Sequence, residues 1–231
     1  DHLILTGGEP TQHPELAAII RLARQAGLRV RMISNGQWAD PDGMLQAFMD
    51  AGLEHVHLSL HSSRAKVQAF LTGKSDSLPC LERSLEATSR KGMSCDINTV
   101  ICAQNSDHLD ETVAWVLDRF PHVRHFVFNN LDPHMNRVLE HPETIPDFLD
   151  LELSLHEALK LLQARDHSFR VERLPLCFMA DFAYASTESR KIVKGEGRIV
   201  HFLDEKGEVV QRDFVHRKFK VCKACALDPI C

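Results

Sequence analysis

The first residues whose types and spacing could do chemistry are Gly7-Gly8-Glu9-Pro10, which follow an apolar segment and precede a helical pattern. Two adjacent glycines let the backbone turn sharply and approach a ligand closely. A carboxylate at the same turn could hold an amine. The segment would also serve as an ordinary loop between a strand and a helix, so taken alone it leaves both interpretations open.

A second group of reactive side chains lies at the end of the chain, where Cys222-Lys223-Ala224-Cys225 is followed by Cys231. Two thiolates in a Cys-x₂-Cys turn can bind one metal ion or cluster. Cys177 is a candidate fourth ligand. The alternatives are a structural zinc site or thiols without a metal, and Cys177, between two large apolar residues, could simply belong to the core.

His55 and His57 share one face of a predicted strand. Such a pair on a barrel strand can bind zinc in metal-dependent hydrolases. Further ligands at other strand ends would be needed, and the sequence does not identify them. A hydrolase using this pair remains a rival enzyme class.

Secondary-structure elements must position these residues. Up to about residue 130, segments with the hydrophobic pattern of a strand alternate with segments that have the pattern of a helix. Apolar segments predict strands at 2–6, 28–34, 54–60, 94–102 and 123–129. Amphipathic segments predict helices at 14–26, 41–51, 78–91 and 106–120. This alternation predicts an α/β fold with a parallel sheet and right-handed crossovers, as a barrel or an open sheet. Ligands of such folds collect at the carboxyl ends of the strands.

The alternation of strand and helix patterns ends after residue 130, where three prolines mark an irregular connection. A helix is predicted at 147–164, an extended segment at 169–176, and a hairpin from 198–203 and 208–214. We therefore expect two domains, with the strand–helix repeats in residues 1–130. Residues 131–231 would form a small α+β extension that carries the helix, the hairpin and the cysteine-rich tail.

Composition narrows the classes of function. The chain has 231 residues, 44% of them hydrophobic, and a net charge of −5, which suits a globular protein with a sizeable core. The absence of a basic excess argues against nucleic acid as the main partner. No apolar run reaches the roughly 18 residues that span a bilayer. Seven unevenly spaced cysteines favour a reducing compartment, the cytoplasm, over a secreted disulfide scaffold.

The polar segments at the strand ends together resemble the radical S-adenosylmethionine (SAM) superfamily. Leu5 to Pro10 resembles the family's Gly-Gly-Glu motif after its second strand, and Ile33-Ser34-Asn35-Gly36 its Thr-Asn-Gly-type turn after the third. Val56 to His61 is similar to the Ser-containing fourth strand. Asn98 to Ile101, followed by Asn105, is similar to the fifth. The four segments occur in the family's order over residues 1–130.

The resemblance implies a partial (β/α)₆ barrel, here without its first strand, that binds S-adenosylmethionine across the strand ends. The implied ligand-binding residues are Gly7, Gly8 and Glu9 for the methionine amino group, Ser34 and Ser59 for the carboxylate or ribose, and Asn98 for the ribose. Ser34 is also a common type of turn residue, and Ser59 could face outward.

One departure from the family pattern concerns the catalytic cluster. The family binds its catalytic 4Fe–4S cluster through Cys-x₃-Cys-x₂-Cys after the first strand, and this spacing is absent here. Because Asp1 leads directly into an apolar strand and Cys231 ends the chain within a cysteine cluster, we expect further sequence at both ends. A degenerate, non-catalytic relative is the competing explanation. The spacing Cys-x₂-Cys-x₅-Cys at the tail resembles the start of the SPASM-like segment that holds auxiliary clusters, so Cys177, Cys222, Cys225 and Cys231 are predicted to bind an auxiliary 4Fe–4S cluster or zinc.

The sequence therefore predicts a fragment of a radical SAM enzyme. The resemblance implies that the complete protein forms a 5′-deoxyadenosyl radical that abstracts hydrogen from a small-molecule or peptide substrate. It also implies an electron donor such as ferredoxin or flavodoxin. A structural-zinc scaffold, the hydrolase and a binding module without chemistry remain alternatives, and the substrate is not identified.

Overall fold

The computed structural model describes residues 1–133, 136–195, 198–202, 207–211 and 218–231. Within these residues, six parallel strands form one sheet in the order β1-β2-β3-β4-β5-β6, and β7 and β8 form an antiparallel hairpin. The strands are β1 (His2–Leu5), β2 (Arg29–Ser34), β3 (Leu53–Ser59), β4 (Ser94–Ile101), β5 (His125–Asn130), β6 (Ser168–Glu172), β7 (Arg198–His201) and β8 (Glu208–Gln211).

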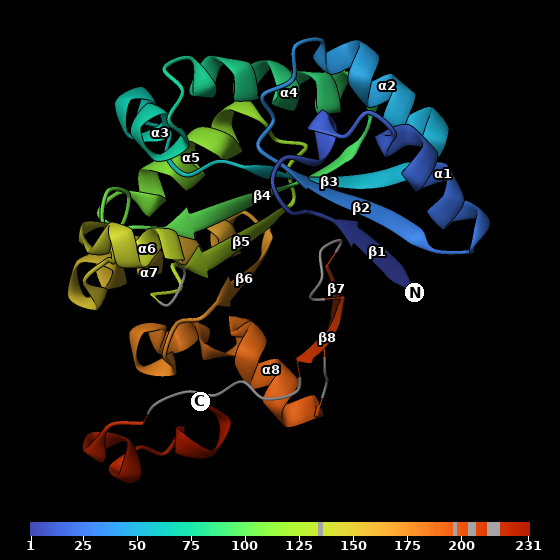
Figure 1. Ribbon diagram of the computed structural model, residues 1–231. Coiled ribbons are helices and arrows are strands. Elements are labelled where there is room, and N and C mark those ends of the chain that lie inside the picture. Colours follow the sequence, from blue (N-terminus) through green and yellow to red (C-terminus); the bar gives the residue numbers. More distant parts are fainter. Residues whose placement is uncertain (134–135, 196–197, 203–206, 212–217) are drawn as a thin grey trace.

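Helices connect consecutive strands and cover one side of the sheet, which curls into a half-barrel (Figure 1). The hairpin and the last helix lie below the sheet in this view. The helices are α1 (Leu16–Gln25), α2 (Pro41–Ala51), α3 (Ala65–Thr72), α4 (Ser77–Lys91), α5 (Leu109–Arg119), α6 (Asn136–Glu140), α7 (Phe148–Ala164) and α8 (Thr187–Lys194). The predicted α/β half-barrel is confirmed.

Local signals explain why α2 matches its predicted bounds. The Asp40 side chain accepts a hydrogen bond from the Gly43 N–H, and Pro41 occupies the first helical position. Gly52 ends the helix with a φ of 105°, which a residue with a Cβ rarely adopts. Leu45 and Phe48 on one face are buried against the sheet.

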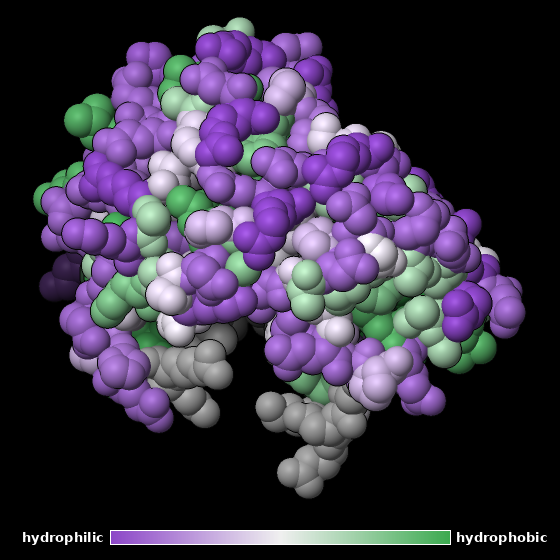
Figure 2. Space-filling view, turned by 90° about the horizontal axis from the view of Figure 1, so that it is seen from above, coloured by the Kyte–Doolittle hydropathy of each residue, from purple (hydrophilic) through white to green (hydrophobic). Residues whose placement is uncertain are grey.

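The core lies between the sheet and these helices. Alternate residues of the strands point toward the helices, and Val30, Met32, Val56 and Leu58 are all completely buried there. The outward-facing side of the helical layer is mostly hydrophilic in the view from above (Figure 2). Among the described residues, no helix combines the length and apolar character needed to cross a membrane.

Several elements differ from the sequence expectation. α1 begins at Leu16 rather than residue 14, because Pro10–Gln12 forms a separate 3₁₀ turn. α5 begins at Leu109 rather than 106, because the preceding residues form a turn in which Asn105 Oδ1 accepts a hydrogen bond from the Cys102 N–H. The short helices α3, α6 and α8 were not predicted.

The sheet also continues past residue 130, where the sequence places a domain boundary. β6 pairs in parallel with β5, and α7 packs against α5. The first part of the extended segment predicted at 169–176 is therefore the sixth strand of the same sheet, which ends at Glu172, and the division at residue 130 stays a prediction. The hairpin is found, but residues 203–206 and 212–217 lie outside the described residues.

Gly36 gives a test of how tightly the β2–α2 turn packs. Its φ is +68°, and a Cβ would lie 2.5 Å from Leu81 Cδ1, whose side chain is fully buried. Gly92 has a nearly identical φ of +65° but open space around the Cβ position. We expect Gly92→Ala to cost about 1–2 kcal/mol of unfolding free energy through backbone strain alone. Gly36→Ala should cost about 1–3 kcal/mol more through overpacking. Urea unfolding measures both, and equal losses would contradict the close packing.

Candidate functional site

The Glu9 carboxylate joins the carboxyl ends of β1 and β2. Its Oε1 accepts hydrogen bonds from Ser34 Oγ at 2.8 Å, Thr11 Oγ1 at 2.7 Å and the Thr11 N–H at 3.2 Å. Its Oε2 accepts one from the Asn35 N–H at 2.7 Å. The carboxylate is therefore fixed in place, and Oε2 keeps a lone pair for a further donor.

Gly7 and Gly8 form an open shelf beside this carboxylate. Gly7 has a φ of +127°, a conformation that residues with a side chain rarely adopt. A Cβ at either glycine would meet no protein atom within 4 Å. Both residues are exposed, so the space above their backbone is accessible to a ligand.

Ser34 is brought to this site, but its hydroxyl group is fully occupied. It donates to Glu9, and it accepts from the Gly36 N–H at 3.1 Å and from Trp38 Nε1 at 2.9 Å. Only 1% of Ser34 is exposed. A direct ligand contact by Ser34 stays a prediction, and the geometry favours an indirect role in orienting Glu9. Sequence reasoning missed Thr11 and Trp38, which complete this network.

Ser59 and Asn98 lie next to each other on the neighbouring strands. They are register partners at the carboxyl end of β3 and within β4. Asn98 Oδ1 accepts a hydrogen bond from Asn129 Nδ2 at 2.6 Å, which fixes the amide and leaves its own NH₂ group available. Both predicted residues are partly exposed. Asn129 of β5 is the partner that sequence reasoning did not single out.

His61 follows β3 at the same edge of the sheet. Its Nδ1 accepts a hydrogen bond from the Val100 N–H at 3.2 Å. An acceptor at Nδ1 requires the neutral ring with its proton on Nε2. Burial lowers the pKa of His61 to about 4, in agreement with this tautomer.

Ser62, His108 and Asp107 have the residue types of a hydrolytic triad. Ser62 Oγ lies 2.7 Å from His108 Nε2, and Asp107 contacts His108 Nδ1. However, Ser62 and His108 are both 0% exposed, and Ser62 Oγ also accepts from the Arg64 N–H. No substrate can reach this hydroxyl group, so the three residues join the β3–α3 and β4–α5 loops.

His55 and His57 do share one face of β3, and Asp96 of β4 joins them. Asp96 Oδ2 lies 2.9 Å from His55 Nε2 and 3.4 Å from His57 Nδ1. Burial, followed by the charge of His55, lowers the pKa of His57 to about 4. Burial alone would raise the pKa of Asp96, but its contacts with the two histidines outweigh burial and lower it.

The four cysteines predicted to bind a metal gather in one region, and all of them are free thiols. Burial raises the pKa of Cys177, and negative charge on Cys231, Cys225 and Cys222 raises it further, which places these sulfur atoms within electrostatic range of one another. Among the described residues, however, no three of these sulfur atoms lie within 4.8 Å of one another.

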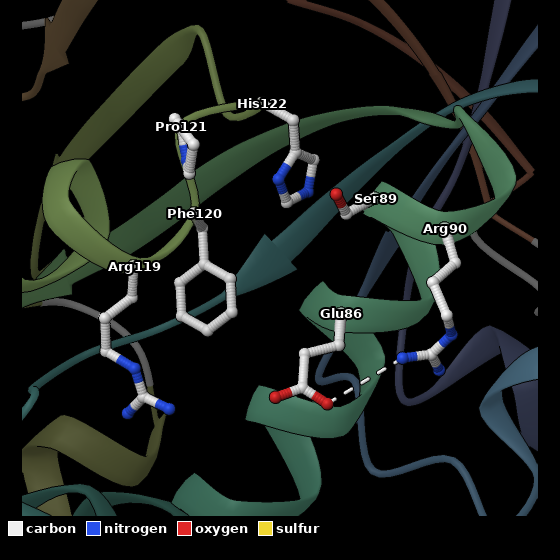
Figure 3. A pocket seen from close by; sticks show the side chains of 7 residues that line it. All are labelled: Glu86, Ser89, Arg90, Arg119, Phe120, Pro121 and His122. Atoms are coloured by element: carbon white, nitrogen blue, oxygen red, sulfur yellow. Dashed lines mark ion pairs between the residues drawn. The ribbon is translucent and has the colours of Figure 1, made fainter.

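A hollow of about 270 Å³ lies elsewhere, between the ends of α4 and α5 (Figure 3). Its lining residues directly precede β4 and β5, so it opens at the amino edge of the sheet. Arg90 and Glu86 form an ion pair at 3.8 Å along α4, on one side of the hollow. Because parallel α/β sheets bind ligands at the carboxyl edge, this hollow is not the candidate site.

Comparison with known proteins identifies the family. The model of the radical SAM superfamily matches residues 1–116. The PqqA peptide cyclase of Ruegeria pomeroyi is 28% identical over 116 residues, covering 50% of this chain and 31% of the relative. The AdoMet-dependent heme synthase of Methanosarcina barkeri is 26% identical over 110 residues, covering 48% and 31%. The chain thus matches about a third of the length of these relatives.

Solved structures support the same conclusion for the fold. The structure of native anSMEcpe with bound AdoMet and Kp18Cys peptide superposes with a TM-score of 0.64 at 14% identity, over 100% of this chain and 74% of that one. The chain belongs to the radical SAM superfamily. The resemblance drawn from the strand ends is confirmed, and the family uses S-adenosylmethionine and a 4Fe–4S cluster.

His61 predicts a pH dependence of stability. Because its pKa is about 4 in the folded chain and about 6.5 in an unfolded one, its contribution is present above pH 6.5 and is lost as pH falls toward 4. From pH 7 to pH 5, the unfolding free energy of the wild type should fall by about 2 kcal/mol more than that of His61→Gln. Urea unfolding at both pH values checks this. The exposed-site variant His13→Gln should follow the wild type, and identical curves for all three proteins would refute the assignment.

Proposed function

We propose that this chain forms the S-adenosylmethionine-binding part of a radical enzyme, with an auxiliary iron–sulfur cluster at its C-terminal cysteines. S-adenosylmethionine binding is supported by the Glu9 carboxylate, which four hydrogen bonds fix beside the open shelf of Gly7 and Gly8. A fixed anion with a free lone pair next to accessible backbone suits the amino group of an amino acid.

The other predicted residues suit the rest of this ligand. The free NH₂ group of Asn98 and the hydroxyl group of Ser59 lie on adjacent strands of the same face. A ribose presents hydroxyl groups that can accept from the amide and bond with the serine. The protonated Nε2 of His61 would add a neutral donor near the same edge. In this proposal Ser34 orients Glu9 and does not touch the ligand.

The catalytic cluster cannot be built from this chain's residues, because the sequence lacks Cys-x₃-Cys-x₂-Cys. We place its ligands outside these residues. In the family, S-adenosylmethionine supplies a 5′-deoxyadenosyl radical when the reduced cluster donates an electron, and we assign no step of that chemistry to residues of this chain.

A peptide is the substrate class that we favour for the whole protein. One relative is named as a peptide cyclase, and the similar structure of anSMEcpe holds a peptide. The heme synthase among the relatives shows why a small-molecule substrate is the alternative. An electron donor such as ferredoxin or flavodoxin and a cytoplasmic location belong to the same proposal.

Two substitutions test the ligand site. Glu9→Ala removes the acceptor for the amine, and Gly8→Val places a side chain where the ligand backbone would lie. Because a Cβ at Gly8 meets no protein atom within 4 Å, the fold should tolerate it. We expect each variant to bind S-adenosylmethionine at least about tenfold more weakly in isothermal titration calorimetry, equivalent to the loss of one charge-assisted hydrogen bond.

Glu15→Ala is the matched control, because Glu15 is exposed in the same connection and its side chain makes no capping hydrogen bond. It should bind like the wild type. Thermal unfolding checks that the two test variants remain folded. Unchanged affinity in both folded variants would refute the site.

We favour a cluster over zinc at the tail thiols, because these thiols are not spaced as the ligands of a zinc ion are. In a tetrahedral zinc site with Zn–S bonds of about 2.3 Å, the sulfur atoms lie about 3.8 Å apart. Since no three of the tail sulfur atoms are within 4.8 Å, the cysteines would have to close in to bind zinc. A four-iron cluster is larger than a single ion and spreads its thiolate ligands further apart.

Anaerobic reconstitution followed by metal analysis tests this choice. We expect iron and acid-labile sulfide in similar amounts, with a brown colour, and the Cys222→Ala/Cys225→Ala double variant should lose this cluster. Cys102→Ala, which removes a buried thiol of β4's carboxyl end, should keep it. Zinc without sulfide would support the structural-zinc alternative, and full iron retention in the double variant would exclude the tail cysteines as ligands.

A further inference from the structure

A second cluster of potential ligands lies on the inner face of the half-barrel, below the proposed S-adenosylmethionine site. His55 and His57 come from β3, and Asp96 comes from the register position opposite His57 on β4. One ligand atom from each lies within 4.8 Å of the other two. Asp96 precedes Asn98 by two residues, so the cluster is about 7 Å farther down the strand than the ligand edge.

The contacts within the cluster are close but poorly aligned for hydrogen bonds. His55 Nε2 is buried and lies only 2.9 Å from Asp96 Oδ2, yet the two groups lack the geometry of a well-aligned hydrogen bond. His57 Nδ1 approaches the same oxygen at 3.4 Å. Two ring nitrogens and a carboxylate oxygen thus converge on one point without the alignment that an N–H donor requires.

Ser94 orients the first of these rings. Its hydroxyl group lies 2.7 Å from His55 Nδ1. If Nδ1 donates to Ser94, Nε2 of the neutral ring presents a lone pair toward the carboxylate, and a shared proton or a metal ion bound by both groups would make this approach favourable. Metal-binding histidines commonly donate their second ring nitrogen to a neighbouring acceptor in this way.

We propose that His55, His57 and Asp96 bind a divalent transition-metal ion on the inner face of the half-barrel. In a tetrahedral site with metal–ligand bonds of about 2.0–2.1 Å, ligand atoms lie about 3.4 Å apart. The two ring nitrogens lie 2.9 and 3.4 Å from Asp96 Oδ2 and within 4.8 Å of each other, so side-chain adjustments of about 1.5 Å or less bring all three to this value. Two imidazoles and one carboxylate suit zinc or cobalt and leave one coordination position open.

Nearby positive charges influence which fourth ligand such a metal ion would bind. Arg31 and Arg170 are close enough to act electrostatically on His57. Their positive charge weakens the binding of a bare cation and favours an anion, such as hydroxide or a carboxylate, in the open position. The site does not depend on the proposed function, because it shares no residue with the S-adenosylmethionine site.

Cobalt binding tests the proposal, because Co²⁺ is a spectroscopic substitute for zinc. The titration uses the 231-residue chain with Cys177, Cys222, Cys225 and Cys231 changed to serine, so that tail thiolates cannot bind the ion. We expect one equivalent of Co²⁺ with visible d–d bands and no thiolate charge-transfer band. His57→Gln and Asp96→Asn should each weaken binding at least about tenfold.

His122→Gln is the matched control, since His122 lies at the amino edge of β5, contacts Thr88 and is not part of the cluster. It should bind Co²⁺ like its parent. Circular dichroism verifies that the variants are folded. NMR of the Co²⁺-loaded parent gives a second measurement that needs no substitution of His55, His57 or Asp96. We expect paramagnetically shifted imidazole N–H signals from two histidines. No Co²⁺ binding by the folded parent, unchanged affinity in both ligand variants, or the absence of those signals would each overturn the proposal.

Discussion

Parallel pairing of the six strands is the constraint on which the rest of the structure depends. Parallel pairing from β1 to β6, with one register shift between Val30 and Arg31 of β2, gives every strand the same division between an inner and an outer face. The outer face carries large apolar side chains such as Val56 and Ile97, which the helices bury. The inner face can therefore carry polar side chains, because the hydrophobic core forms on the outer face.

At the carboxyl edge, hydrogen bonds rather than packing fix the positions of these polar groups. Glu9 connects the loop after β1 to the end of β2, and Trp38 holds Ser34, which holds Glu9. Asn105 donates to the carbonyl groups of His61 and Val100, so the ends of β3 and β4 are joined in the same way. Such a network preorganises the edge, since each polar group is oriented before any ligand arrives.

Much of this could be predicted from the sequence, for reasons that particular residues make clear. The bounds of α2 follow from Asp40 and Gly52, because caps act over a few neighbouring residues. Glu9 and Ser34 were both predicted as site residues, but their mutual hydrogen bond joins positions 25 residues apart and is visible only in three dimensions. Asp96 was missed for the same reason, since only strand register places it opposite His57. β6 was assigned to the extension because the rhythm of the sequence breaks before it, while its pairing with β5 is tertiary.

The same alternation explains how one face can hold two separate chemistries. The backbone positions of His57 and Ser59, like those of Asp96 and Asn98, are about 7 Å apart along their strands, so the carboxyl edge and the histidine cluster lie at different levels of the same face. Ser59 and Asn98 therefore lie at the edge where we propose that the ligand binds, whereas His57 and Asp96 contact each other one level below. Because Asn98 is held by Asn129 and His55 by Ser94, each layer has its own supports. A change in one layer consequently leaves the supports of the other in place, and the two sites can be examined independently in the same chain.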